Sequence, residues 1–315
     1  MRRAVLALIA AALMAISAVM PAAAITGNSQ EDFEHPFVGL VAFYDIVGVE
    51  DDPTNQGDDP LDTFLGRCSG SLIDDGNTAN GSRVFLTAGH CPDVGDGVNV
   101  ADYAFIWFRQ DAGTRFDGVA NPFDPLTGYP DRCIDDPAVA LDACVKAHVM
   151  FNYGFNNFAG FPDTHDTGIV ILDSAVSMPE YGELPDVGAL DVLVGTGRGS
   201  KDTTFLASGY GLSYSSPVAF ESFRERLMGF GKLVNLVSAN NGGFNIQTNG
   251  NGHGKGGTCS GDSGGPIFWP ADTNQIVAVT SFGLNAWCRG TDFSYRLDTA
   301  AVQDWIAEVS APYAD

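Results

Sequence analysis

Residues 261–266 have the sequence GDSGGP, which surrounds Ser263 with glycines. Glycines allow a tight turn and let backbone N–H groups point at one spot with no Cβ atoms in the way. A serine in such a turn suits nucleophilic catalysis, because its hydroxyl stands next to amides that can bind an anion. The structural alternative is a glycine-rich turn with an uninvolved serine, so further groups are needed to decide.

The spacing Gly261-x-Ser263-x-Gly265 also fits the nucleophile turn of α/β-hydrolases, whose catalytic histidine follows the serine in the chain. The five histidines of this chain all precede Ser263, and that order excludes the α/β-hydrolase fold. They are His35, His90, His148, His165 and His253.

A general base must therefore lie upstream, and His90 is the best candidate. It stands in residues 87–91 (TAGHC), directly after a strand-like run. A neutral imidazole near physiological pH can accept the serine proton and return it to a leaving group.

Such a base needs a carboxylate that fixes the tautomer of its ring. Asp166 stands just before the apolar run 168–172. Asp163 lies in a turn that begins with a proline, and Asp173 lies at the far end of the run, so we favour Asp166 over these alternatives.

Short β-branched or aromatic runs, separated by Gly, Asp, Asn and Pro, recur along the chain and predict an all-β barrel or sandwich. Asn80-Gly81 predicts a hairpin turn between two of the runs. The runs cover residues 37–44, 70–73, 83–87, 103–108, 168–172, 205–211, 232–237, 266–269 and 276–282.

A helix is predicted only at the end of the chain, with Asp298 or Thr299 as its cap. Its apolar residues recur at helical spacing: Val302, Trp305, Ile306 and Val309.

Residues 1–24 have the features of a secretory signal peptide. Arg2 and Arg3 precede the apolar run 4–20, and small residues follow at 21–24 (PAAA). A membrane anchor is the alternative, but the run is short for a span of about 20 residues, and a cleavage pattern follows it at once. We therefore expect a secreted, extracellular protein without a stable membrane anchor.

The chain is strongly acidic, with 39 Asp and Glu against 16 Lys and Arg and a formal net charge of −23. Such a surface repels phosphate backbones, so we expect no nucleic acid among the partners.

Six cysteines in an exported chain predict disulfides, because that compartment is oxidising. Six allow 15 pairings. Sequence order suggests Cys68–Cys91, Cys133–Cys144 and Cys259–Cys288. No C-x-x-C or H-E-x-x-H occurs, so we expect no metal and no cofactor. Calcium stays an option at the acidic loop 50–62, which lacks the alternation of an EF-hand loop.

The segments 87–91 (TAGHC), 166–172 (DTGIVIL) and 261–266 (GDSGGP), in this order, resemble the motifs of the trypsin/chymotrypsin-like serine endopeptidase family. The resemblance covers essentially all of residues 25–315. It implies two packed antiparallel six-stranded β-barrels with a C-terminal helix.

The same resemblance divides the chain. After the signal peptide at 1–24 we expect one protease domain at 25–315. Its N-terminal barrel covers about 25–176, a connector about 177–193, and the C-terminal barrel and helix about 194–315.

The family's mechanism is carried over with the resemblance. Ser263 attacks the scissile carbonyl, His90 is base and then acid, and Asp166 orients His90. The backbone N–H groups of Gly261 and Ser263 form the oxyanion hole. The resemblance thus implies a serine endopeptidase that works through an acyl-enzyme, with polypeptide substrates, protein inhibitors as further partners, and a monomeric state. An esterase with the same triad and a non-catalytic binding protein on this scaffold are the alternatives.

The resemblance also implies a specificity pocket. Ser281, Phe282 and Gly283 match the segment that pairs with the substrate backbone, and Cys259–Cys288 matches the disulfide that frames the pocket.

Trypsin-like members carry an Asp at the base of the pocket, six residues before the nucleophile. This chain has Gly257 at that position, followed by Thr258. This predicts an uncharged P1 residue, because an unpaired cation would be costly to desolvate there. Asp292 reverses that prediction if the register of residues 292–295 brings it into the pocket.

Finally, residues 25–28 (ITGN) resemble the activated amino terminus of the family, which pairs with the carboxylate before the nucleophile, here Asp262. Ile25 follows Ala24 directly. We therefore expect signal peptidase itself to release the activating amine.

Overall fold

The computed structural model describes residues 25–46, 63–76, 78–93, 100–112, 144–194, 203–221, 225–250 and 256–314. The acidic loop 50–62 lies largely outside these residues, as do the signal segment and Cys133. No helix within the described ranges is long and apolar enough to cross a bilayer.

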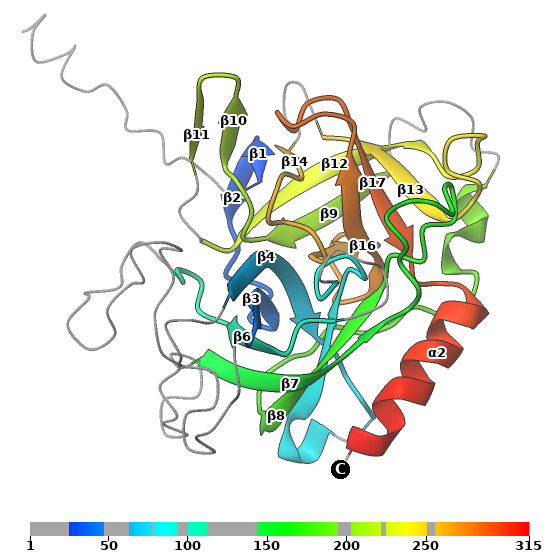
Figure 1. Cartoon of the computed structure of the whole chain (residues 1–315). Coiled ribbons are helices and arrows are strands. Elements are labelled where there is room, and N and C mark those ends of the chain that lie inside the picture. Colours follow the sequence, from blue (N-terminus) through cyan, green and yellow to red (C-terminus); the bar gives the residue numbers. More distant parts are fainter. Residues whose placement is uncertain are drawn as a thin grey trace, which may run out of the picture.

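The first barrel is closed and antiparallel, in the strand order β3-β4-β5-β8-β7-β6 (Figure 1). Its strands are rich in the β-branched and aromatic residues that fit a pleated, half-buried surface. They are β3 (Val38–Asp45), β4 (Thr63–Leu72), β5 (Ser82–Thr87), β6 (Tyr103–Trp107), β7 (Cys144–Asn152) and β8 (Gly168–Val176).

The second barrel closes in the same way, because β13 pairs with both β12 and β17. Its strands are β9 (Thr204–Gly209), β12 (Leu227–Asn235), β13 (Asn245–Asn249), β15 (Pro266–Phe268), β16 (Ile276–Gly283) and β17 (Thr291–Arg296). The expected pair of six-stranded barrels is confirmed.

Short strands complete the sheets. β2 (Ser29–Glu31) adds to the edge of β12, and β1 (Thr26–Gly27) pairs with β14 (Gly256–Gly257). β10 (Tyr214–Ser216) and β11 (Ala219–Glu221) form a hairpin. The 3₁₀ turns cover Thr78–Asn80, Ala189–Leu193 and Ala311–Tyr313.

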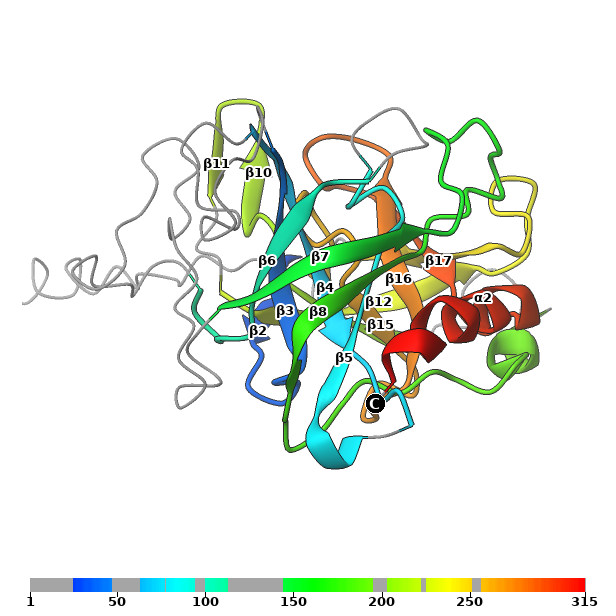
Figure 2. The same cartoon turned by 60° about the horizontal axis from the view of Figure 1, so that its bottom comes forward.

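The helix α2 (Ala300–Ser310) is present as predicted and packs beside the first barrel (Figure 2). Val302 and Ile306 are buried in the core that spans both barrels. Thr299 is the N-cap residue, as predicted, but its side chain makes no capping bond. Asp298 instead accepts hydrogen bonds from Arg296 and from the Leu190 N–H.

Local sequence patterns missed β7, β13 and β17. β7 begins at Cys144, which we interpreted only as a disulfide residue, and β13 (NIQTN) is too polar to read as a strand. Asn80-Gly81 lies between β4 and β5, which pair as an antiparallel hairpin as predicted. The connection is longer than a two-residue turn, because a 3₁₀ turn ends at Asn80 and Gly81 takes a positive φ of 95°.

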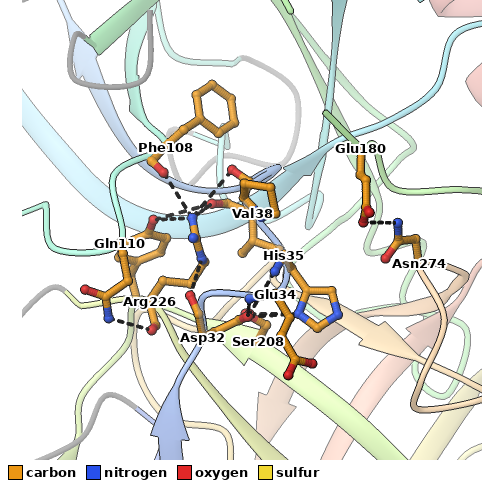
Figure 3. Close-up of polar contacts among 12 residues, drawn as sticks. Asp32, Glu34, His35, Val38, Phe108, Gln110, Glu180, Ser208, Arg226 and Asn274 are labelled. Carbon is orange, nitrogen blue, oxygen red and sulfur yellow. Dashed lines mark hydrogen bonds and ion pairs between the residues drawn. The ribbon is translucent and has the colours of Figure 1, made fainter. Parts of the chain in front are cut away.

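One buried arginine ties the barrels together (Figure 3). Arg226, just before β12, donates from Nη1 to the carbonyls of Val38 (3.1 Å) and Phe108 (3.0 Å) in the first barrel. Its Nε donates to the Asp32 carbonyl at 3.0 Å. These bonds satisfy a guanidinium that is 3% exposed, and they hold the barrels in one relative position.

Candidate active site

His90 and Asp166 are in direct contact at the mouth between the barrels. Nδ1 of His90 lies 2.9 Å from Oδ2 of Asp166, and the His90 backbone N–H donates to Oδ1 at 2.8 Å. Asp166 precedes β8 and His90 follows β5, and these strands pair with Thr87 opposite Gly168. The barrel register therefore brings the two residues together.

Asp166 has a further partner from the second barrel, because the Ser281 hydroxyl donates to Oδ2. Burial would raise the pKa of Asp166, but the charge of His90 and the hydrogen bonds from His90 and Ser281 outweigh it and lower the pKa. Burial alone would lower the pKa of His90, and the charge and hydrogen bond of Asp166 raise it instead. The pair can thus hold a proton on the imidazole.

The two alternative carboxylates have other partners. Asp163 contacts Nε2 of His165 at 3.1 Å and accepts from the Tyr295 hydroxyl at 2.7 Å. Asp173 contacts Nδ1 of His148 at 2.7 Å. Among the described residues, Asp166 is the carboxylate on the ring of His90.

A second Asp–His–Ser grouping is buried beneath the first barrel. Nδ1 of His35 lies 3.0 Å from Asp32, and the Ser208 hydroxyl donates to the same carboxylate at 2.5 Å (Figure 3). His35 is 4% exposed and its ring stacks on Phe268. Both groups bind Asp32 in the interior, so this grouping supports the fold.

The turn around Ser263 is anchored to both barrels. The Ser69 N–H donates to the Ser263 carbonyl at 2.8 Å, and the Gly264 N–H donates to the Thr280 carbonyl at 2.8 Å. Gly264 has φ of 77°, and a Cβ there would overlap the Thr87 hydroxyl and the Ser69 carbonyl. Glycine is therefore required for the turn to pack beside the strand that leads to His90.

Within the described residues, the amides of this turn fall into two groups. Those of Asp262, Gly264 and Gly265 donate to protein carbonyls, whereas those of Gly261 and Ser263 make no hydrogen bond. Gly261 has φ of 98°, which a residue with a Cβ rarely adopts. The free N–H groups are the ones that the family resemblance assigns to an oxyanion hole.

A pocket of about 330 Å³ opens beside Ser263. Its lining includes Thr258, Ser281, Phe282 and Gly283, together with both cysteines of the Cys259–Cys288 disulfide. Ser281 links this pocket to Asp166. His90 and Ser263 make no hydrogen bond to each other in the described part of the chain, and such bonds often tighten only when substrate binds.

The trypsin family model matches residues 166–306, from Asp166 through Ser263 to the middle of α2. This part of the chain is therefore similar to the trypsin family. A search of the curated proteins finds no match.

Solved structures agree on the fold. Protease Anisep from Arthrobacter nicotinovorans has a TM-score of 0.54 at 14% identity, covering 90% of this chain and 100% of its own. The thermostable serine protease AL20 from an extremophilic microorganism has 0.51 at 17%, covering 88% and 97%. Human heparin binding protein has 0.52 at 17%, covering 91% and 97%.

The disulfides of the described residues include Cys68–Cys91, with sulfurs 2.02 Å apart, and Cys259–Cys288. Cys144 is also disulfide-bonded, while its expected partner Cys133 lies outside the described residues. Among the described residues, the group close enough to hold a metal is Cys68, His90 and Cys91, and the two sulfurs are bonded to each other. Those residues do not suit a metal.

Ile25 and Asp262 have different neighbours. Ile25 is fully buried, and its side chain packs close to Gly229 and Gly256. Asp262 accepts from the N–H groups of Gly211 (2.7 Å) and Cys259 (2.9 Å). Burial raises the pKa of Asp262 to about 7, although those bonds and the charge of Arg67 oppose the shift.

Sequence reasoning left Asp292 undecided and overlooked the bond from Ser281 to Asp166. The register of β16 and β17 pairs Gly283 with Asp292, and a Cβ on Gly257 would lie 3.1 Å from the Asp292 Oδ2. The signal for Asp292 was a single acidic residue near the start of the final strand.

Proposed function

We propose that this trypsin-like chain is a serine endopeptidase with the nucleophile Ser263, the general base His90 and the orienting residue Asp166. The observation that carries the proposal is the contact between His90 and Asp166, joined through Ser281 to the pocket that Ser263 lines. A serine, a base and an orienting carboxylate in this order form an acyl-transfer site.

The free N–H groups of Gly261 and Ser263 support the same proposal. Donors held in place for a developing oxyanion are typically worth about 3–4 kcal/mol each in the transition state. An esterase would use the same groups, so amide hydrolysis is the distinguishing activity.

A non-catalytic binding protein is the second candidate, because human heparin binding protein shares this fold. Two observations oppose that function here. A formal net charge of −23 opposes binding of a polyanion, and the serine, histidine and aspartate of the site are all in place.

Secretion is part of the proposal. The segment 1–24 has the pattern of a cleaved signal, and disulfides such as Cys68–Cys91 suit an oxidising compartment. The partners are then extracellular polypeptides.

The test uses a fluorescent organophosphonate on the purified chain. We expect one label per molecule, on Ser263, and none on the matched Ser263→Ala variant. Cleavage of peptide amides as well as esters is expected from the wild-type protein alone. Absence of labelling in the wild-type protein would identify a non-catalytic scaffold. Cleavage of esters without cleavage of amides would identify an esterase.

The earlier expectation of an uncharged P1 residue depends on Gly257 alone. Since Asp292 lies against Gly257, that preference is not part of this proposal.

A further inference from the structure

The carboxylate of Asp292 lies next to two residues that line the pocket beside Ser263, Thr258 and Gly283. β17 pairs Asp292 with Gly283 of β16, and residues directly opposite each other in antiparallel strands project to the same face of the sheet. Gly283 lines the pocket. Asp292 therefore directs its side chain to the pocket side of the sheet.

A second contact places the carboxylate at the same point. Oδ2 of Asp292 accepts a hydrogen bond from the Thr258 N–H at 3.1 Å, and Thr258 is another residue of the pocket lining. The carboxylate is thus held between the two walls of the pocket, one formed by Thr258 and the other by Gly283.

Two glycines lie against the Asp292 carboxylate. A Cβ on Gly257 would lie 3.1 Å from Oδ2, and a Cβ on Gly283 would lie 3.8 Å from Oδ1. Because neither residue has a side chain, no side chain at these positions covers the carboxylate. A bulkier residue at either position would separate it from a ligand in the pocket.

Asp292 has no compensating charge among the described residues. It is 4% exposed, Thr258 supplies its hydrogen bonds, and no Lys or Arg of the described chain pairs with it. Burial raises the pKa of Asp292 to about 7 against the effect of those bonds. The neighbouring buried acid, Asp262, adds no positive charge. A cation that entered the pocket would supply the missing partner.

We propose that Asp292 makes this pocket select a cationic P1 side chain, lysine or arginine, in place of the uncharged residue that Gly257 alone predicts. The inference rests on the proposed function, because P1 is the residue whose carbonyl Ser263 attacks. A guanidinium or ammonium in a water-poor pocket forms strong charge-assisted hydrogen bonds with a buried carboxylate. The acidic residue that selects the cation comes from β17. Gly257, which the resemblance places at the base of the pocket, supplies no acidic side chain.

The first experiment compares two peptide amides that differ only at P1, one with arginine and one with citrulline, its neutral isostere. The Asp292→Asn variant keeps the shape of the side chain and an acceptor oxygen for Thr258. We expect wild-type kcat/KM to be far higher for arginine. We expect the ratio of kcat/KM for arginine to kcat/KM for citrulline to be lower in Asp292→Asn by about 30-fold or more. This is the usual effect of removing one partner of a buried charge pair.

Labelling of Ser263 by the organophosphonate is the control for Asp292→Asn, because this reaction depends on the nucleophile and base and not on a charged P1 side chain. Full labelling shows that the variant is folded and its triad intact. A wild-type ratio near one, or a ratio that Asp292→Asn leaves unchanged, overturns the inference.

A binding measurement separates this inference from the proposed function. p-Aminobenzamidine, a fluorescent cation, should bind the wild type and bind Asp292→Asn about 30-fold or more weakly. If the amidine binds in this way while the phosphonate does not label Ser263, the proposed catalytic function is wrong and the cation-binding role of Asp292 is supported. If the phosphonate labels Ser263 but the amidine does not bind through Asp292, the proposed function stands and the pocket assignment is wrong.

Discussion

At the scale of single residues, Asp166 is the point where the site is assembled. It accepts the His90 backbone N–H, faces the His90 ring and accepts the Ser281 hydroxyl. Asp166→Asn should therefore lower kcat by about 10⁴-fold, since the amide holds the wrong imidazole tautomer. The matched variant Asp163→Asn should stay close to wild type, because Asp163 contacts His165 and Tyr295. Steady-state kinetics on one peptide amide checks both.

The same contact sets the pH dependence. Since Asp166 raises the pKa of His90 and only the neutral ring can act as base, kcat/KM should fall as pH drops through a value above the ordinary 6.5. In Asp166→Asn the fall should occur at lower pH. A near-active Asp166→Asn beside an inactive Asp163→Asn would show that the orienting residue is wrongly assigned.

At the scale of elements, the turn 261–265 depends on close packing against the first barrel. A Cβ on Gly264 would overlap Thr87 and Ser69, and its φ of 77° disfavours any side chain. Gly264→Ala should cost about 1–2 kcal/mol for the left-handed backbone and about 1–3 kcal/mol more for the overlap. It should also lower kcat, because the Ser263 amide moves.

Gly76→Ala is the matched control for that turn. Gly76 has a similar φ of 86°, but an added Cβ meets nothing within 4 Å, so only the backbone cost of about 1–2 kcal/mol applies. Denaturant unfolding measures both free energies of unfolding. Equal losses in the two variants would show that the turn has room to move.

At the scale of the whole molecule, the amino end of the domain lies beside the segment that precedes the nucleophile turn. β1 pairs with β14, Ile25 is buried beside Gly256, and the buried Asp262 carboxylate has a pKa raised to about 7. We propose that cleavage after Ala24 frees an α-ammonium that pairs with this under-compensated carboxylate. Secreted active protein should then begin at Ile25 on N-terminal sequencing.

Two variants test that pairing. Asp262→Asn, or one extra residue ahead of Ile25, should leave a folded protein whose kcat is lower by about 10²-fold, the cost of a poorly formed oxyanion hole. Circular dichroism supplies the folding control. Full activity in protein with another first residue excludes the mechanism and leaves Arg67 as the described cation acting on Asp262.

Local sequence pattern determined the fold class and the candidate catalytic residues. Ser263 among glycines, His90 after a strand and Asp166 before one are recognisable in the chain, because tight turns and strand ends have compositions of their own. The same patterns missed β13 and β17, whose polar residues are stabilised by barrel pairing that no short segment contains.

Only the tertiary structure decided which groups meet. The β5–β8 register places Asp166 on His90, and the β16–β17 register brings Asp292 beside Gly257. Asp163 and Asp173 contact other histidines, His165 and His148. Asp292 and Gly257 are far apart in sequence, and a slip of one residue would turn the carboxylate to the opposite face of the sheet. Strand pairing over long separations therefore sets the charge of the pocket, and the chain's local composition does not reveal it.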